Sequence, residues 1–330
     1  MYPELFKIPF THWSVPSYGF MLVIGFLAAV SVIRHLSRDI TPNPALITNA
    51  ALYSLIAGVV GARLFYVIHY FGNFRGNLLS IFAVWQGGLE LLGGVLLAVT
   101  VIVFYLVYHK LPVRRYLDIL AIGLTLALAF GRVGCFLNSC CFGKPTNLPW
   151  AVRFPYHSSL HTHSYPYRSQ AYPDLKRNRP QPHLKLSSDF FEYTEKDGLW
   201  YSQLKPYEAL TSHQKEMVDN GQYRCLPVHP TQLYSSANGL FLCLLLYLFR
   251  RRAIRSSKNT TKLFAAPGCT FALMLILYGI TRFLIEFLRD DNPFTELTGL
   301  TVSQNICIAL IVLGISLMLI FEKTKSKSRS

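Results

Sequence analysis

Seven stretches of the chain are apolar over about the length needed to cross a bilayer, and this feature constrains the fold most. A hydrocarbon core about 30 Å thick takes about 20 apolar residues of helix. The stretches lie near 16–33, 46–69, 88–108, 118–137, 230–249, 267–288 and 300–321. Helices satisfy their own backbone hydrogen bonds in lipid. The sequence therefore predicts an all-α integral membrane protein with about seven transmembrane helices.

The third of these stretches belongs to an apolar region that is too long for one simple span. It runs from Leu78 to Val107 and is interrupted by the pairs 87–88 and 93–94, which are both Gly-Gly. Non-helical backbone at membrane depth is tolerated where protein or a cavity covers it. We therefore expect a broken or re-entrant segment before the third helix.

The charged residues predict how the chain is oriented. Only 15% of the 330 residues are charged, yet the net charge is +15. Fifteen Lys and Arg residues lie in alternate connections and the C-terminal tail, whereas the other short connections hold only Arg75 and Arg289. The positive-inside rule places the N-terminus outside and the C-terminus in the cytoplasm. Since no nucleic-acid recognition motif accompanies the basic residues, we expect contacts with anionic membrane lipids and none with nucleic acid.

These features divide the chain into four parts. Residues 1–138 hold transmembrane helices 1–4, with the N-terminus outside, and residues 229–321 hold helices 5–7. Residues 139–228 are polar and predict a small extracytoplasmic domain of irregular or strand structure. Residues 322–330 form a basic cytoplasmic tail. The first apolar stretch has its basic residues behind it, which is not typical of a cleavable signal peptide.

Ionisable residues inside the apolar stretches are expensive and indicate function. Arg63, Arg132 and Arg282 lie in three different stretches. Tyr278, Arg282 and Glu286 follow at a spacing of four, which places them on one helix face. Three buried arginines beside few acids predict a cavity for an anion such as a lipid phosphate, which the planar guanidinium group suits. The alternative is an Arg282–Glu286 pair that only joins helices.

Other polar groups gather near the predicted outer face. His229, Gln232 and Tyr234 open the fifth helix. Four of the seven cysteines lie near this face, namely Cys135, Cys140, Cys141 and Cys225. Disulfides persist on the outer side of a membrane, so a bond from Cys225 to Cys140 or Cys141 is one alternative. One alternative function is a membrane thiol oxidoreductase that uses these cysteines. Another is a zinc-dependent membrane hydrolase in which His161 and His163 bind the metal together with the cysteines. A transporter is a further alternative.

Several short motifs recur in a fixed order. They are 17–19 (Ser-Tyr-Gly), 61–66 (Gly-Ala-Arg-Leu-Phe-Tyr), 85–88 (Trp-Gln-Gly-Gly), 131–132 (Gly-Arg) with Gly143, 229–234 (His-Pro-Thr-Gln-Leu-Tyr), 278–289, which contains Arg-Phe-Leu-Ile-Glu-Phe-Leu-Arg, and 299–304 (Gly-Leu-Thr-Val-Ser-Gln). With these motifs the chain resembles the prolipoprotein diacylglyceryl transferases. The resemblance covers nearly all of the chain except about 145–225.

The resemblance implies a multi-pass transferase of the bacterial inner membrane. That family moves the diacylglyceryl group of phosphatidylglycerol onto the lipobox cysteine of a prolipoprotein signal peptide, forms a thioether and releases glycerol phosphate. This is the first step of lipoprotein maturation. We expect neither a cofactor nor a metal. The expected catalytic residues are Arg132, Arg282, Glu286, Tyr278 and His229, and the expected substrate-binding residues are Arg63, Tyr18, Gln232, Tyr234, Arg289 and Gly143.

Three positions depart from the family pattern. Leu92, Cys135 and Cys140 stand where the family usually has His, Asn and Glu. The phosphate-binding part of the predicted site is therefore intact, whereas the proton acceptor is missing. Candidates for this base are His229, Glu90 and Glu286, since burial raises the pKa of a carboxylate. A divergent member with another acceptor, or a thiol oxidoreductase using Cys135, Cys140 and Cys141, is the alternative.

Overall fold

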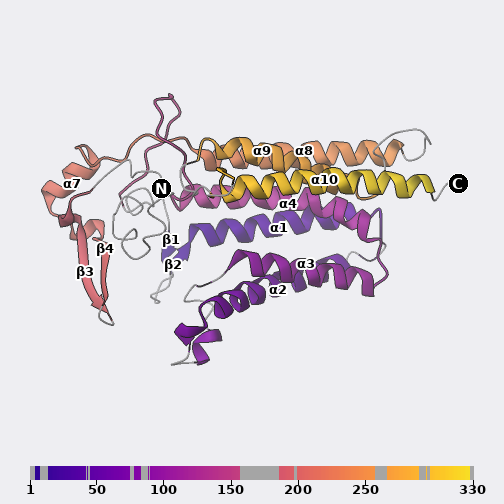
Figure 1. Ribbon diagram of the computed structural model, residues 1–330, viewed down its shortest axis with the longest axis horizontal. Helices are drawn as coiled ribbons and strands as arrows, with labels where there is room; N and C mark the ends of the chain where they lie inside the picture. Colours follow the sequence, from indigo (N-terminus) through magenta and orange to yellow (C-terminus); the bar gives the residue numbers. More distant parts are fainter. Residues whose placement is uncertain are drawn as a thin grey trace.

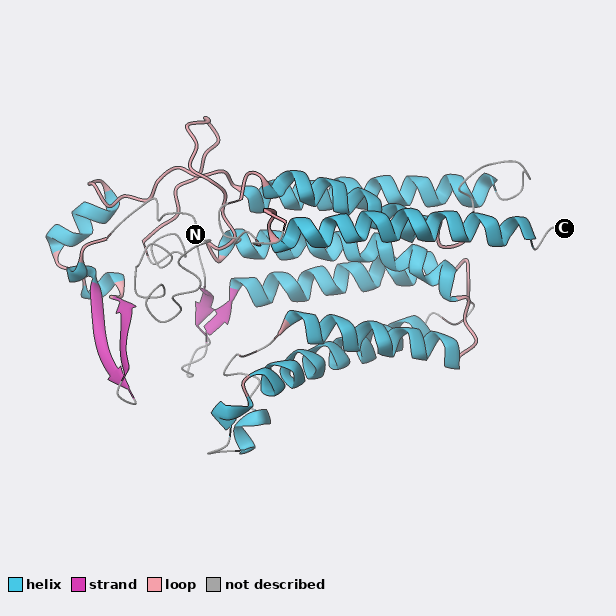
Figure 2. Cartoon of the chain, viewed as in Figure 1, coloured by secondary structure: helices cyan, strands magenta, loops and turns pink. Residues whose placement is uncertain are grey.

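Long helices run roughly along one axis of the molecule and form its apolar body (Figures 1 and 2). They are α1 (Ser17–Ser37), α2 (Ala45–His69), α3 (Leu91–Tyr108), α4 (Val113–Leu137), α8 (Thr231–Ser256), α9 (Cys269–Glu286) and α10 (Val302–Lys327). The computed structural model describes residues 4–7, 14–41, 43, 45–74, 78–82, 88, 90–156, 186–196, 199–256, 266–289, 295 and 298–327.

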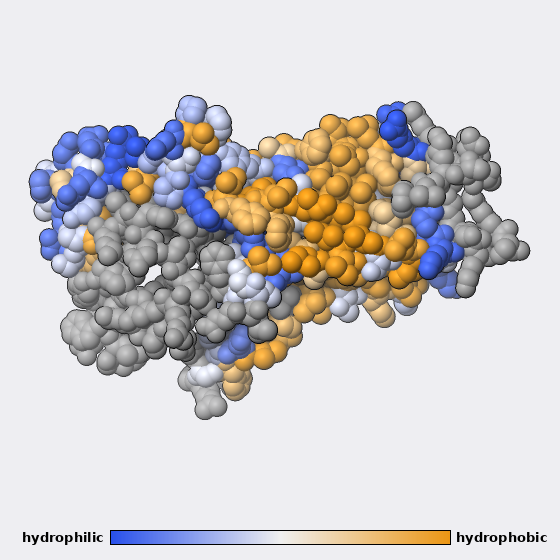
Figure 3. Space-filling model, turned by 45° about the horizontal axis from the view of Figure 1, so that its top comes forward, coloured by the Kyte–Doolittle hydropathy of each residue, from blue (hydrophilic) through white to orange (hydrophobic). Residues whose placement is uncertain are grey.

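Within this described part, six helices are long and apolar enough to cross a membrane, and α3 contributes a shorter apolar helix, Gly93–Tyr108. Their outward side chains are apolar, for example Leu27 (60% exposed), Ile68 (64%) and Phe104 (70%). Figure 3 shows a broad hydrophobic surface over the helices, between two more polar ends. A surface of this kind fits lipid rather than water. The expected all-α membrane fold is confirmed.

The break before the third helix has a different form from the one we expected. Two short 3₁₀ helices, η1 (Phe71–Phe74) and η2 (Leu78–Phe82), precede α3. Gly93 and Gly94, expected to interrupt the segment, lie inside α3. A Cβ at Gly61 would come within 2.5 Å of the Gly93 carbonyl oxygen, so glycine lets α2 and α3 cross closely. These glycines therefore serve packing, while Gly87 lies outside the described residues.

Helix α4 forms the centre of the bundle and packs against α1, α8 and α9, while α10 packs on α9. Its buried side chains Tyr116, Ile119 and Ile122 join the main apolar core. Helices α2 and α3 pack chiefly on each other and form a hairpin beside this bundle (Figure 1). The core thus fixes α4, α8 and α9, which carry the site described below.

The ends of the bundle differ in composition. Helices α1, α3 and α8 end where the chain finishes (Figure 1), and basic residues stand in or next to their last two turns, for example Arg38, Lys110 and Arg251. The opposite end carries the N-terminal hairpin, β1 (Glu4–Lys7) with β2 (Ser14–Pro16), and the polar region after α4. Because successive helices run in opposite directions, the basic connections gather at one end of the bundle and the polar head lies at the other. Helix α10 continues to Lys327, so the expected basic tail is largely helical.

Where the structure describes it, the polar head contains an antiparallel hairpin and short helices. Strand β3 (Phe191–Lys196) pairs with β4 (Leu199–Leu204), flanked by the 3₁₀ helices η5 (Ser188–Phe190) and η6 (Tyr207–Ala209). Helix α7 (Ser212–Asp219) follows, and the expectation of irregular or strand structure missed it. The available signal was Thr211 with Gln214, which form a capping box at its start. His161 and His163 lie outside the described residues.

Candidate active site

A narrow cavity lies between α4, α8 and α9 in the half of the bundle that faces the polar head. Arg132 enters it from α4, and Tyr278 and Arg282 enter it from α9. Ser235 and Asn238 contribute polar groups from α8. The cavity volume is about 20 Å³, which is room for about one water molecule. The structure thus brings together two of the three predicted membrane arginines and the predicted tyrosine.

Glu286 lies one helical turn beyond Arg282 and is shared by two arginines. Its Oε2 atom is 2.5 Å from Nη1 of Arg282 and 3.8 Å from Nε of Arg289. Its Oε1 atom accepts a hydrogen bond from the Thr301 hydroxyl at 2.9 Å. Arg282 also approaches the Ser303 hydroxyl, at 3.4 Å from Nη2. One carboxylate is therefore shared by two guanidinium groups, and with Arg132 the region holds three positive charges against one negative charge, an excess that suits an anion.

Arg63 lies at a different place from these arginines. Its guanidinium group donates to the backbone carbonyls of Ser80 (2.6 Å), Ile81 (2.8 Å) and Gly88 (3.0 Å). It also lies over the rings of Tyr66 and Phe74. Carbonyls outside regular helix need donors inside a membrane protein, and Arg63 supplies them. Within the described residues, Arg63 is therefore placed to hold the broken segment, and it is not part of the lining of the Arg132 cavity.

We expect Arg63→Lys to destabilise the protein although the charge is kept. A lysine cannot reproduce the planar fork that meets three carbonyls, and each charge-assisted hydrogen bond contributes about 1.5–3 kcal/mol. The thermal unfolding midpoint in detergent should fall by several degrees. Arg34→Lys, at an exposed position of α1, is the matched control and should leave the midpoint unchanged. Equal midpoints for both variants would contradict the bracing role.

Hydrogen bonds connect the loop after α4 to the start of α8 and to the end of α9. The Gly143 amide donates to the His229 carbonyl (2.9 Å), and the Lys144 amide donates to the Leu288 carbonyl (2.8 Å). The Gln232 amide group donates to the Cys140 carbonyl at 2.7 Å. Gln232 is fully buried, and its Oε1 atom has no hydrogen-bond partner within the described part of the chain. Gly143 and Gln232 are thus placed to fix the loop.

Gly143→Ala should disturb this junction strongly. A Cβ atom there would lie 2.6 Å from the Leu288 carbonyl oxygen and 2.7 Å from both His229 Cβ and Thr231 Cγ2. The first atom belongs to the backbone, and the second is bonded directly to the backbone. The Thr231 side chain is held by its hydrogen bond to the Cys141 carbonyl, so these neighbours cannot rotate away. We expect a lower unfolding midpoint and faster limited proteolysis between α4 and α8. Gly72→Ala, with no atom within 4 Å of the added Cβ, is the control, and equal proteolysis of both variants would contradict the prediction.

His229 and Tyr234 form a polar group at the surface with a partner that the sequence analysis missed. The Tyr234 hydroxyl lies 3.3 Å from His229 Nδ1 and accepts a hydrogen bond from the Trp150 indole at 2.7 Å. Neither side chain lines the Arg132 cavity as described. Glu90, another candidate base, is 2.7 Å from Nδ1 of His69, which the sequence analysis also missed. Both candidates are therefore already engaged.

Tyr18 opens α1 beside the last turns of α4. A Cβ on Gly134 would lie 3.2 Å from the Tyr18 ring, so the two helices touch here. Tyr18 also interacts electrostatically with Arg132 and with Cys135. The structure therefore brings this predicted substrate-binding residue close to the predicted phosphate-binding arginine.

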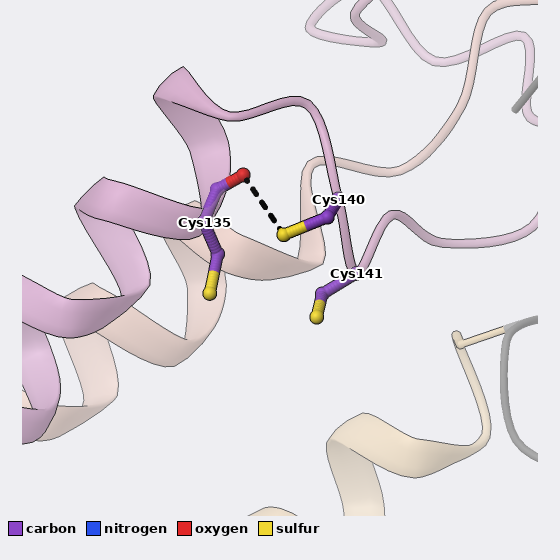
Figure 4. Close-up of side chains that lie close together, drawn as sticks. All are labelled: Cys135, Cys140 and Cys141. Carbon is purple, nitrogen blue, oxygen red and sulfur yellow. Dashed lines mark hydrogen bonds between the residues drawn. The ribbon is translucent and has the colours of Figure 1, made fainter. Parts of the chain in front are cut away.

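Three cysteines meet where α4 ends (Figure 4). The sulfur atoms of Cys135, Cys140 and Cys141 all lie within 4.8 Å of one another. Hydrogen bonds from Cys135 and Cys140, together with the nearby Arg289, lower the pKa of the Cys141 thiol below its usual range. All seven cysteines are free, and Cys225 is buried beside Phe142. The disulfide considered for Cys225 is therefore not formed in this structure.

The helical bundle and its arginine-lined cavity define a multi-pass membrane protein with a cationic site between its helices. The sequence profile of the prolipoprotein diacylglyceryl transferase family matches residues 3–320. The chain belongs to this family.

Three curated relatives carry the name phosphatidylglycerol–prolipoprotein diacylglyceryl transferase. The one from Buchnera aphidicola (strain 5A) is 28% identical over 328 residues, which cover 96% of both chains. The one from Clostridium tetani is 28% identical over 315 residues, with the same coverage of both chains. The one from Burkholderia ambifaria is 30% identical over 314 residues, which cover 91% of this chain and 88% of the relative.

Proposed function

We propose that this protein transfers the diacylglyceryl group of phosphatidylglycerol to the lipobox cysteine of prolipoproteins, in the bacterial inner membrane. Family membership over nearly the whole chain supports this first step of lipoprotein maturation. The observation that carries it in the structure is the convergence of Arg132 and Arg282 on one cavity inside the apolar bundle. A phospholipid is a partner with an anionic phosphate and apolar chains, which such a cavity suits.

The reaction requires that negative charge be stabilised where it leaves. The cysteine sulfur attacks a glycerol carbon, a carbon–sulfur bond forms, and the carbon–oxygen bond to the phosphate breaks. The phosphate departs as glycerol phosphate and carries away the electron pair. Preorganised donors in a low-dielectric site stabilise such charge far more than water-exposed donors do. We assign this role to Arg132 and Arg282.

The other predicted residues receive supporting roles. Glu286 holds the guanidinium groups of Arg282 and Arg289 in place, since both of its oxygen atoms face donors. Tyr278 lines the same cavity, and we assign to its hydroxyl a hydrogen bond to the phosphate. To Tyr18, which interacts electrostatically with Arg132, we assign a role in binding the lipid. The site lies towards the end that we predict to face outside, where a translocated signal peptide presents its cysteine.

Genetic complementation tests the proposed function. Expression of the chain in bacteria depleted of their own transferase should restore growth and yield thioether-lipidated prolipoprotein. Membrane fractions should be blotted for the expressed protein as a control. Unmodified precursor in cells whose membranes contain the protein would contradict the proposal.

A further inference from the structure

The cysteine cluster is built into the fold rather than scattered near it. Cys135 is buried in the last turns of α4, and Cys140 and Cys141 are partly buried in the loop that follows. Ser139 and Cys141 have positive φ angles of 55° and 62°. Residues other than glycine rarely adopt this conformation, which costs of order 1–3 kcal/mol at each position. The turn is thus held in a strained form that returns two thiols towards Cys135 (Figure 4).

Side chains at the start of α8 hold this turn through hydrogen bonds to its backbone. Gln232 donates to the Cys140 carbonyl at 2.7 Å, and Thr231 donates to the Cys141 carbonyl at 2.9 Å. Both side chains are fully buried. The positions of the thiols are therefore set by the packing of the bundle.

We propose that Cys135, Cys140 and Cys141 bind one Zn²⁺ ion, with its fourth coordination position open. Zinc–sulfur bonds of about 2.3 Å in a tetrahedral site place sulfur atoms about 3.8 Å apart. The three sulfur atoms here lie within 4.8 Å of one another, so small side-chain rotations close the site. Three protein ligands with one open position are the pattern of a reactive zinc site, whereas structural sites use four.

The surrounding charges suit such a site. Three thiolates and one Zn²⁺ ion carry a net charge of −1. The Arg289 side chain lies within hydrogen-bonding reach of Cys141, and Arg132 interacts electrostatically with Cys135. Cationic neighbours would oppose a bare cation, but they stabilise this anionic complex. Arg289 also pairs with Glu286, which connects the cluster to the arginine-lined cavity.

This inference rests on the proposed function and supplies the proton acceptor that it lacks. Within the described residues, Glu286, Glu90 and His229 are all engaged with other groups. The lipobox thiol would displace a zinc-bound hydroxide, which takes the thiol proton and leaves as water. A thiol coordinated to zinc is deprotonated outright. The bound thiolate then attacks the glycerol carbon, and the electron pair of the carbon–oxygen bond leaves with the phosphate.

Metal analysis of the full-length protein tests the site. Protein purified in detergent without chelators should hold close to one zinc per chain by inductively coupled plasma mass spectrometry. Cys141→Ser should reduce that content severalfold, whereas Cys243→Ser, in α8 and outside the cluster, should not change it. Size-exclusion chromatography checks that both variants are folded. The inference would be overturned by wild-type protein that transfers lipid but holds no zinc, or that holds copper instead of zinc. Either result would leave the proposed function standing.

Cobalt replacement tests the open position. Co²⁺ in the site should show sulfur-to-cobalt charge-transfer absorption in the near ultraviolet. Addition of a lipobox peptide should increase this absorption by about one third as a fourth thiolate binds, whereas the Cys→Ser peptide should leave it unchanged. A spectrum that both peptides leave unchanged would contradict the role in binding the acceptor. A protein that binds zinc and the cysteine peptide but never transfers lipid would contradict the proposed function instead.

Discussion

Arg282→Ala is expected to lower kcat for diacylglyceryl transfer at least 100-fold. Arg282 on α9 and Arg132 on α4 line the same cavity. If these groups hold the departing phosphate, each contributes stabilisation that appears as charge develops. Loss of one such preorganised donor costs about 10²–10³ in kcat. Arg132→Ala should have an effect of the same size.

The measurement is a rate with purified protein, fluorescent phosphatidylglycerol and a lipobox peptide. Arg34→Ala is the control, because this exposed arginine lies at the basic end of α1. A KM that rises with unchanged kcat would indicate ground-state binding only. Transfer at wild-type kcat by both cavity variants would contradict the phosphate-binding assignment.

Glu286→Gln is expected to reduce both stability and transfer. The Glu286 side chain is only 1% exposed and pairs with Arg282 and Arg289, whose side chains are 11% and 5% exposed. Removing one partner of a buried ion pair costs about 3–5 kcal/mol, since the other charge stays buried. The amide can still accept from Thr301, so the change isolates the charge. The freed guanidinium groups would also lose their orientation towards the cavity.

Thermal unfolding in detergent and the transfer rate should be measured on the same preparation. We expect the unfolding midpoint to fall by several degrees and kcat to fall at least tenfold. Glu208→Gln, at an exposed position of the polar head, is the control. A midpoint equal to that of the wild type would show that Glu286 does not stabilise the arginines as we describe.

The sequence predicted much of the bundle, because hydropathy reports length and burial directly. The seven helices lie close to the expected stretches, and the i, i+4 spacing correctly placed Tyr278 and Arg282 on one cavity-facing surface. Buried charge in the sequence also pointed to Arg63, but it could not distinguish a substrate-binding arginine from one that stabilises the backbone of the broken segment. That distinction depends on the carbonyls of Ser80, Ile81 and Gly88, which reach Arg63 only in the folded chain.

The cysteines show a second limit of pattern reasoning. Their spacing suggested a redox pair or a disulfide to Cys225. What brings Cys135, Cys140 and Cys141 together is the left-handed backbone of Ser139 and Cys141, and residues of this type give little signal for it. Likewise, Gly93 reads as a helix breaker in sequence, whereas its close approach to Gly61 makes it a packing residue.

Mass spectrometry of the acceptor peptide tests most directly whether the protein transfers a diacylglyceryl group from phosphatidylglycerol to the lipobox cysteine. Purified protein is incubated in detergent with phosphatidylglycerol of defined acyl chains and a lipobox peptide, and the Cys→Ser peptide is the control. We expect the cysteine peptide alone to gain the mass of one diacylglyceryl group, with glycerol phosphate released in equal amount. Folded protein that leaves the cysteine peptide unmodified would contradict this expectation.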